Sequence, residues 1–107
     1  MVKRVEDREH LMIVASMRCV VCKKTPVQCH HLLQPHSGPR GLSLRSGDDN
    51  VIPLCYEHHA ELHTKFGNEK KFFKHYFEDE DYGKNKAKQL YEQTIYEREN
   101  PEDDLPF

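Results

Sequence analysis

The stretch DDNVIPLCYEHHAELH, residues 48–63, decides the fold of this 107-residue chain. It places one cysteine and three histidines within nine positions, 55–63. Its apolar run predicts an extended segment over residues 50–54, and the residues after Pro53 predict a helix over residues 56–65. Cysteine and histidine are common zinc ligands in proteins. The stretch therefore predicts metal binding, with further ligands supplied by other parts of the chain.

Two pairs of candidate ligands share one spacing. Cys19 and Cys22 are separated by two residues, which lets a single turn direct both thiolates at one ion. Cys55 and His58 repeat this spacing farther along the chain. The four side chains predict a closed Cys3His site for structural Zn2+, which would stabilise a small domain. Cys29 is an alternative to His58 as fourth ligand, and four unrelated buried side chains are the other interpretation.

The remaining histidines predict a second, open metal site. His59 and His63 are four residues apart on the expected helix and so share one face of it. His30 and His31 lie on an expected strand, where neighbouring side chains point to opposite sides. One of them can complete a three-histidine site, which leaves coordination positions for water and a phosphate oxygen. Capping, packing or a second structural zinc is the alternative.

The composition indicates a thin core and an intracellular protein. Only 36% of the residues are apolar, 32% are charged and tryptophan is absent. Charges run through the first ten residues, so no signal peptide is expected, and no apolar run approaches the roughly 20 residues of a membrane span. We therefore expect a cytoplasmic location, where the four cysteines bind metal rather than form disulfides.

The remaining segments predict an α+β fold in one domain. A helix is expected over residues 5–16, a tight turn over residues 23–26, a strand over residues 27–32 and an exposed loop over residues 35–49. Two C-terminal helices are expected to direct apolar faces at the core, formed by Phe72, Phe73, Tyr76 and Phe77 and by Ala87, Leu90, Tyr91 and Ile95. The domain is expected over residues 1–98, with its core over 17–66, before a flexible acidic tail over 99–107.

Three pieces of the sequence, CVVC, HHLL and DDNVIPLCYEHHAELH, occur in an order that resembles the HNH endonucleases. These belong to the ββα-metal (His-Me finger) superfamily, and the likeness is to small zinc-stapled members encoded by phages and prophages. It covers about residues 8–66. The resemblance implies a ββα-metal finger with a zinc knuckle, flanked by an N-terminal helix and C-terminal helices. It also implies metal-dependent hydrolysis of DNA to 5'-phosphate and 3'-hydroxyl ends, in phage or bacterial recombination, repair or replication.

The resemblance assigns roles to five residues of this chain. His30 corresponds to a ligand of the catalytic metal, and His31 corresponds to the general base. Asn50 corresponds to the asparagine that orients the loop and the base. His59 and His63 correspond to the remaining ligands of the catalytic metal.

The zinc site departs from the family pattern at one position. The usual fourth zinc ligand is cysteine, whereas this chain has His58, so the division of ligands between the two sites stays open at this point. The expected cofactors are structural Zn2+ and a catalytic Mg2+ or Mn2+. Histidine ligands also accept Ni2+ or Zn2+ at the catalytic position.

The distribution of charge is compatible with DNA binding. Residues 1–76 contain twelve basic and eight acidic side chains, whereas residues 77–107 contain four and ten. The candidate DNA contacts are Arg40, Arg45, Lys65, Lys70 and Lys71. A solvated surface is the alternative for each of them, and a non-catalytic zinc-finger DNA-binding or accessory module is the alternative function. The substrate structure and the choice between monomer and homodimer stay open.

The last six residues, EDDLPF, resemble the C-terminal tip of bacterial single-stranded DNA-binding proteins. In those proteins the tip is a docking peptide whose terminal Phe enters an apolar pocket. The resemblance implies that host factors recognise Asp103, Asp104, Leu105, Pro106 and Phe107. A solubilising tail is the alternative, although Leu-Pro-Phe is a poor composition for one.

Overall fold

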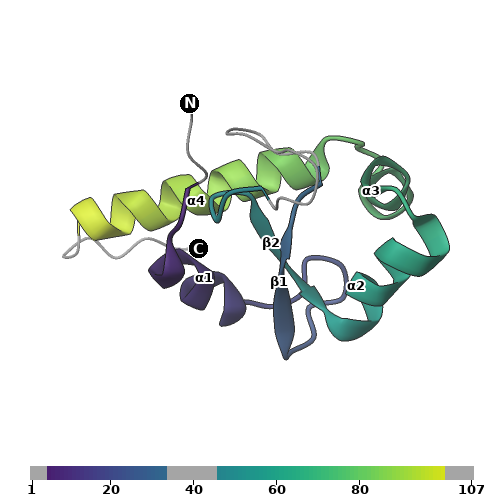
Figure 1. Cartoon of the computed structure of the whole chain (residues 1–107), viewed down its shortest axis with the longest axis horizontal. Coiled ribbons are helices and arrows are strands. Elements are labelled where there is room, and N and C mark those ends of the chain that lie inside the picture. Colours follow the sequence, from purple (N-terminus) through teal and green to yellow (C-terminus); the bar gives the residue numbers. More distant parts are fainter. Residues whose placement is uncertain (1–4, 34–45, 101–107) are drawn as a thin grey trace.

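The computed structural model describes residues 5–33 and 46–100. Within these residues the chain forms a two-stranded sheet, four α-helices and one π-helical turn (Figure 1). The elements are α1 (Arg8–Ala15), β1 (Val27–His31), β2 (Val51–Cys55), α2 (Tyr56–Glu61), η1 (Leu62–Phe66), α3 (Glu69–Phe77) and α4 (Tyr82–Glu99). The predicted α+β fold class is confirmed. Every predicted helix and strand in the described residues is present, with boundaries shifted by a few residues.

The two strands and the helix after them form one continuous ββα unit. Strands β1 and β2 pair antiparallel, with His30 opposite Ile52 and His31 opposite Val51. Helix α2 begins at Tyr56, directly after the last residue of β2. Because strand side chains alternate, the two adjacent histidines of β1 face opposite sides of the sheet.

The predicted single helix over residues 56–65 is two elements. Helix α2 ends at Glu61, and η1 continues the coil with wider π geometry. The N–H of Gly67 donates to the carbonyl of Leu62 at 2.8 Å, five residues back. Gly67 has φ 62°, a left-handed conformation that glycine adopts without strain, and it ends the coil. Sequence periodicity did not predict the widening, which is frequent at functional sites.

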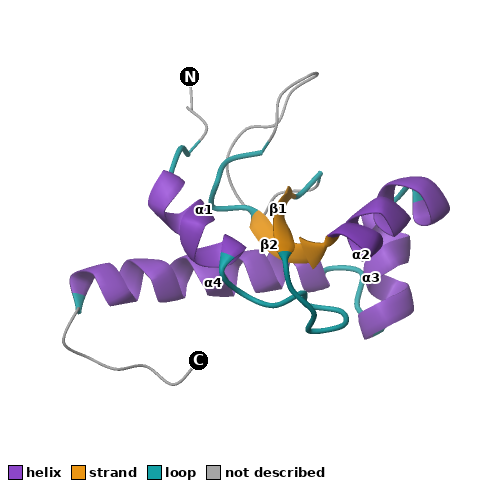
Figure 2. Ribbon diagram, turned by 90° about the horizontal axis from the view of Figure 1, so that it is seen from below, coloured by secondary structure: helices purple, strands orange, loops and turns teal. Residues whose placement is uncertain are grey.

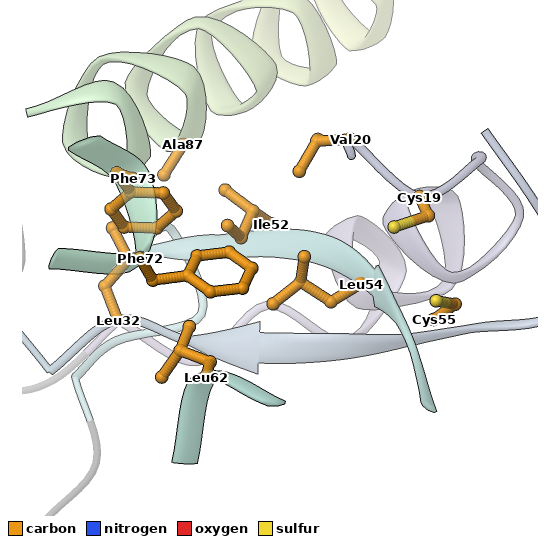
Figure 3. Close-up of a cluster of buried hydrophobic side chains, with 10 residues drawn as sticks. All are labelled: Cys19, Val20, Leu32, Ile52, Leu54, Cys55, Leu62, Phe72, Phe73 and Ala87. Atoms are coloured by element: carbon orange, nitrogen blue, oxygen red, sulfur yellow. The ribbon is translucent and has the colours of Figure 1, made fainter. Parts of the chain in front are cut away.

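The core lies between the sheet and the C-terminal helices. Its buried side chains come from the turn over residues 19–23, called the knuckle below, from the residue after β1, and from β2, η1, α3 and α4. Figure 3 shows them: Cys19, Val20, Leu32, Ile52, Leu54, Cys55, Leu62, Phe72, Phe73 and Ala87. The predicted aromatic face of α3 is therefore core. Helix α4 approaches α3 closely at Gly83, where an added Cβ would lie 2.4 Å from the Phe73 ring.

Helices α1 and α4 form a second contact layer beside the sheet (Figure 2). Asp7 caps α1 by accepting from the N–H of His10 at 3.1 Å. The same carboxylate accepts two hydrogen bonds from Arg98 near the end of α4, at 2.5 and 2.8 Å. Buried His10 contacts Thr94 of α4 through Nδ1 at 2.7 Å. This polar pairing was not evident from the sequence, which indicated only the apolar positions of α4.

Residues 5–33 and 46–100 contain no helix with the length and apolar character needed to cross a bilayer.

We expect the domain to lose stability as the pH falls below about 6.5, in part through His10. Burial lowers the pKa of His10 in the folded protein, and within the described residues its Nε2 has no hydrogen-bond partner. The unfolded chain therefore binds this proton more tightly, and protonation favours unfolding. In His10→Gln, whose amide can still bond Thr94, the drop in unfolding free energy between about pH 7 and about pH 5.5 should be smaller than in the wild type.

Urea unfolding at both pH values measures this difference. The candidate zinc ligands titrate in both the wild type and His10→Gln. The difference between the two pH dependences of the unfolding free energy therefore isolates the contribution of His10. An identical pH dependence in the two proteins would contradict the assignment.

Candidate functional site

Four predicted zinc ligands meet at one point of the structure. Cys19 and Cys22 come from the turn before β1, Cys55 ends β2 and His58 lies on α2. One ligand atom from each lies within 4.8 Å of every other. The structure therefore contains a Cys3His cluster that could hold a metal ion, compatible with structural zinc.

The separations within this cluster match a tetrahedral zinc site. Cys22 Sγ and Cys55 Sγ are 3.7 Å apart, and Nδ1 of His58 lies 3.8 Å from Cys19 Sγ and 3.2 Å from Cys55 Sγ. Tetrahedral bonds of about 2.3 Å to sulfur and about 2.0 Å to nitrogen imply roughly 3.8 Å between sulfurs and roughly 3.5 Å between sulfur and nitrogen. These separations are compatible with a structural zinc ion at the centre of the four side chains.

Backbone contacts hold the turn that carries the first two cysteines. The N–H of Lys23 donates to the carbonyl of Cys19 at 2.9 Å, and Lys23 itself has φ 65°, which completes the tight turn. The N–H of Val20 donates to the carbonyl of Pro53 at 3.1 Å. This last bond attaches the turn to β2, two residues before the third cysteine of the cluster.

The protonation chemistry of the cluster also suits a metal. Burial opposes ionisation of Cys19, but hydrogen bonds from the backbone of Cys55, Cys22 and Val21 lower its thiol pKa to about 6. Burial raises the pKa of Cys55, and the adjacent sulfurs raise it further. Ionisation of three adjacent thiols is unfavourable without a cation, because the thiolates repel one another. A bound Zn2+ stabilises the deprotonated form.

Cys29 lies outside this cluster. Its Sγ donates to the carbonyl of Leu11 in α1 at 3.3 Å, and burial raises the pKa of its thiol. His58 is therefore the fourth member of the cluster, and the alternative in which Cys29 takes that position is not seen.

The second predicted cluster also forms. His30 on β1, His59 on α2 and His63 on η1 each direct a ring nitrogen into a region where these atoms lie within 4.8 Å of one another. His30 is buried, His59 is half-buried and His63 is exposed, so the cluster opens toward solvent on one side. Unlike the Cys3His cluster, it brings together three candidate ligands from the described residues and is exposed on one side, so a bound ion could keep positions open for other ligands.

Two neighbouring side chains fix the tautomers of these histidines. The carboxylate of buried Glu69 lies 2.6 Å from Nε2 of His30, so this nitrogen carries the proton and Nδ1 is left to bind metal. Gln28 Oε1 lies 2.6 Å from Nδ1 of His59, which leaves Nε2 of His59 as the ligand atom. Those two free nitrogens, His30 Nδ1 and His59 Nε2, are 3.1 Å apart.

The electrostatics keep His59 in the form that binds metal. Burial lowers its pKa to about 4, and the adjacent His30 and His63 lower it as well. The ring is therefore neutral near pH 7, with a lone pair available for a cation.

His31, on the opposite side of β1, pairs with a carboxylate. Its Nε2 lies 2.9 Å from Oδ1 of Asp48, a half-buried contact that leaves Nδ1 as the acceptor nitrogen. The second oxygen of Asp48 accepts the backbone N–H of Asp7 at 2.8 Å. This arrangement orients one imidazole for proton transfer.

Asn50 is fully buried in the turn before β2. Its side chain donates to Asp49 at 3.0 Å, its N–H donates to the carbonyl of Gly47 at 3.0 Å, and its carbonyl accepts from Leu32 at 2.9 Å. These contacts attach Asn50 to the turn before β2 and to the residue after β1. The side chain seen against the His31 ring, however, is that of Asp48.

Sequence reasoning missed three supporting residues. Gln28 had a usable signal, because it is two residues from His30 and hence on the same strand face. Asp48 lies in the quoted stretch, two residues before Asn50, but its contact with His31 depends on how the intervening loop folds. Glu69 carried no local signal, because nothing in the sequence marks a first-turn helix carboxylate as buried.

The predicted DNA contacts fall into two groups. Lys65 on η1 and Lys70 and Lys71 in the first turn of α3 are exposed, close in sequence to His63 and Glu69. Arg40 and Arg45 lie outside the described residues, as do the predicted docking residues Asp103, Asp104, Leu105, Pro106 and Phe107.

Replacing one ligand of the Cys3His cluster should remove its metal. We expect Cys55→Ser to lose one tightly bound zinc per chain and to unfold or aggregate, because structural zinc contributes on the order of 10 kcal/mol in small zinc domains. Cys29→Ser is the matched control and should keep its zinc. Metal analysis and circular dichroism of both purified variants measure this. Equal zinc content in the two variants would contradict the assignment of the cluster.

Glu69 should control the affinity of the histidine cluster for metal. We expect Glu69→Gln to weaken Mn2+ or Ni2+ binding by about 10- to 100-fold, the usual effect of losing a carboxylate that orients a ligand histidine. Glu78→Gln, an exposed change of the same kind, is the control. Calorimetric titration of zinc-loaded protein gives both affinities. Equal affinities in both variants would show that Glu69 does not act on the cluster.

A family model described as a protein of unknown function, DUF968, matches residues 2–89. Comparison with curated proteins and with solved structures gave no significant match. The matched segment covers more than half of the chain and contains both clusters. The chain therefore belongs to the DUF968 family.

Proposed function

We propose that this protein is a metal-dependent DNA endonuclease with an HNH-type ββα-metal fold. It hydrolyses phosphodiester bonds to leave 5'-phosphate and 3'-hydroxyl ends. The observation that carries the proposal is that two adjacent residues of β1 belong to two different arrangements, a cluster of candidate metal ligands and a histidine–carboxylate pair. His30 belongs to an open three-histidine cluster, and His31 is an imidazole oriented by a carboxylate.

The order of the elements supports the same proposal. Strands β1 and β2 and helix α2 follow one another as a ββα unit, and the Cys3His cluster joins the turn before β1 to the junction of β2 and α2. A purely structural protein has no need of a second cluster with an open side and with Glu69 and Gln28 fixing its tautomers.

The histidine cluster fits a divalent cation, which His30, His59 and His63 would hold. Mg2+ or Mn2+ is the proposed working ion, and the imidazole ligands also accept Ni2+ or Zn2+. When bound, such a cation supplies positive charge that stabilises the charge developing on the phosphate during cleavage.

His31 acts as the general base. With the proton of Nε2 held by Asp48, Nδ1 accepts a proton from water as the water oxygen attacks phosphorus. The bond from phosphorus to the 3' oxygen breaks, and that oxygen takes a proton from solvent. Asp48 remains ionised and stabilises the imidazolium that forms, as a carboxylate partner does in other imidazole bases.

The substrate is brought to the site by the exposed cations beside it. Lys65, Lys70 and Lys71 extend from the two segments that carry His63 and Glu69. Contacts of this kind bind phosphates without reading bases, so we propose cleavage with low sequence preference. The setting is phage or bacterial recombination, repair or replication, with host factors recruited through residues 103–107.

Replacing the base should abolish cleavage and leave the metals in place. Supercoiled plasmid is incubated with zinc-loaded protein and Mg2+ or Mn2+. We expect His31→Ala to lose at least about 10²-fold in nicking rate, as removal of a general base does. His75→Ala, an exposed histidine outside both clusters, is the matched control and should retain the wild-type rate.

Two further readouts complete this experiment. Nicks that DNA ligase reseals carry 5'-phosphate and 3'-hydroxyl ends, as proposed. Zinc content and Mn2+ affinity of His31→Ala should match the wild type, because His31 is outside both clusters. Nicking that persists in His31→Ala would overturn its role, and wild-type protein that binds DNA without nicking it would favour a binding module.

A further inference from the structure

An open groove of about 530 Å³ lies between the zinc knuckle and α4, and the proposed function does not use it. Its apolar lining comes from three segments: Met17 and Val20 at the knuckle, Pro53 on β2 and Leu90 on α4. Val20, Pro53 and Leu90 are almost completely buried as residues, so the groove reaches down to the core. Such a lining favours a ligand with apolar groups.

Three cations surround this apolar lining. Arg18, Lys23 and Lys86 all border the groove, and Nη1 of Arg18 donates to the carbonyl of Lys23 at 3.3 Å. Burial lowers the pKa of Lys86, and the charge of Lys23, which borders the same groove, lowers it further. Across residues 5–33 and 46–100, none of the three forms an ion pair with a carboxylate. The groove therefore offers concentrated positive charge to an anionic ligand.

These two properties together fit an acidic peptide with apolar residues. A nucleic-acid strand would satisfy the cations but would leave the apolar lining unused. The segment EDDLPF of this chain, residues 102–107, has three acids followed by Leu105, Pro106 and Phe107. We propose that this segment binds in the groove of its own chain, with Asp103 and Asp104 toward the cations and its Leu and Phe side chains against the apolar lining.

The length of the connection permits this binding within one chain. Helix α4 ends at Glu99, and Asn100 has the non-helical angles φ −131° and ψ 61°. Pro101 disfavours a helical residue before it, so the chain can reverse direction here. Lys86 lies roughly 20 Å back along α4 at about 1.5 Å per residue, and the five residues from Glu99 to Asp104 reach roughly 17 Å when extended, a difference that the long Lys86 side chain can span.

Because residues 102–107 are covalently linked to α4, a weak contact is sufficient for them to occupy the groove. A short linker gives an effective concentration in the millimolar range, so docking occurs without high intrinsic affinity. A docked segment hides Phe107 from other proteins, and an external partner must first displace it. The inference concerns a surface outside both metal clusters and does not depend on nuclease activity.

A single tryptophan tests the proposal in the full chain. The protein has no tryptophan, so Phe107→Trp provides a reporter at the docking position. At low salt we expect blue-shifted emission and protection from acrylamide quenching, both lost when Lys23→Glu and Lys86→Glu are added. Lys88→Glu, the same charge change at an exposed position of α4 that does not line the groove, should leave the signal unchanged.

Charge reversal keeps the test independent of folding defects. In the Lys23→Glu, Lys86→Glu background, Asp103→Lys with Asp104→Lys should restore the blue shift, and zinc content should stay at the wild-type level throughout. The signal should be independent of protein concentration. Emission of a fully solvated tryptophan in the parent, equal loss in Lys88→Glu, or appearance of the shift only at high concentration would each overturn the proposal. A Lys23→Glu, Lys86→Glu protein that loses oligonucleotide binding with unchanged emission would also overturn it and assign the groove to nucleic acid.

Discussion

The convergence of three thiols and one imidazole on a common centre is the constraint on which the rest of the structure depends. It joins the knuckle, the end of β2 and the start of α2, three segments that a thin core would hold only weakly. Because α2 starts immediately after Cys55, the direction of β2 and the placement of Cys55 and His58 determine where α2 points. His59, the next residue, then faces His30 across the sheet edge. The position of the Cys3His cluster thus determines where the histidine cluster forms.

The clusters could be predicted from the sequence because their spacing is local. Two residues between ligands, or four along a helix, fix relative positions through backbone geometry alone. Glu69 could not be predicted, since it reaches His30 across 39 positions of the chain and only the packing of α3 brings it there. The π-helical turn was also missed. Gly67 accounts for its end, but helix propensity does not distinguish a hydrogen bond to the carbonyl five residues back from one to the carbonyl four residues back.

Asp48 links the imidazole of His31 to helices α1 and α4. One oxygen contacts His31 and the other accepts the N–H of Asp7, whose own side chain caps α1 and binds Arg98. The orientation of a single imidazole is therefore attached to the packing of α1 against α4. Fixed hydrogen bonds of this kind lower the rotational freedom of the His31 ring.

The pairing register of β1 with β2 decides which of its two histidines joins the histidine cluster and which contacts Asp48. Cys29 and His31 share one strand face, and Gln28 and His30 share the other. A slip by one residue would invert both faces and place His31 among the helix histidines, with His30 beside Asp48. Because both positions are histidine, a one-residue slip would still place an imidazole on each face of the strand. The identity of these two residues therefore does not select the correct register. Protection comes from their neighbours: a slipped strand would turn buried Leu32 outward and separate the imidazole of the cluster from Glu69 and Gln28.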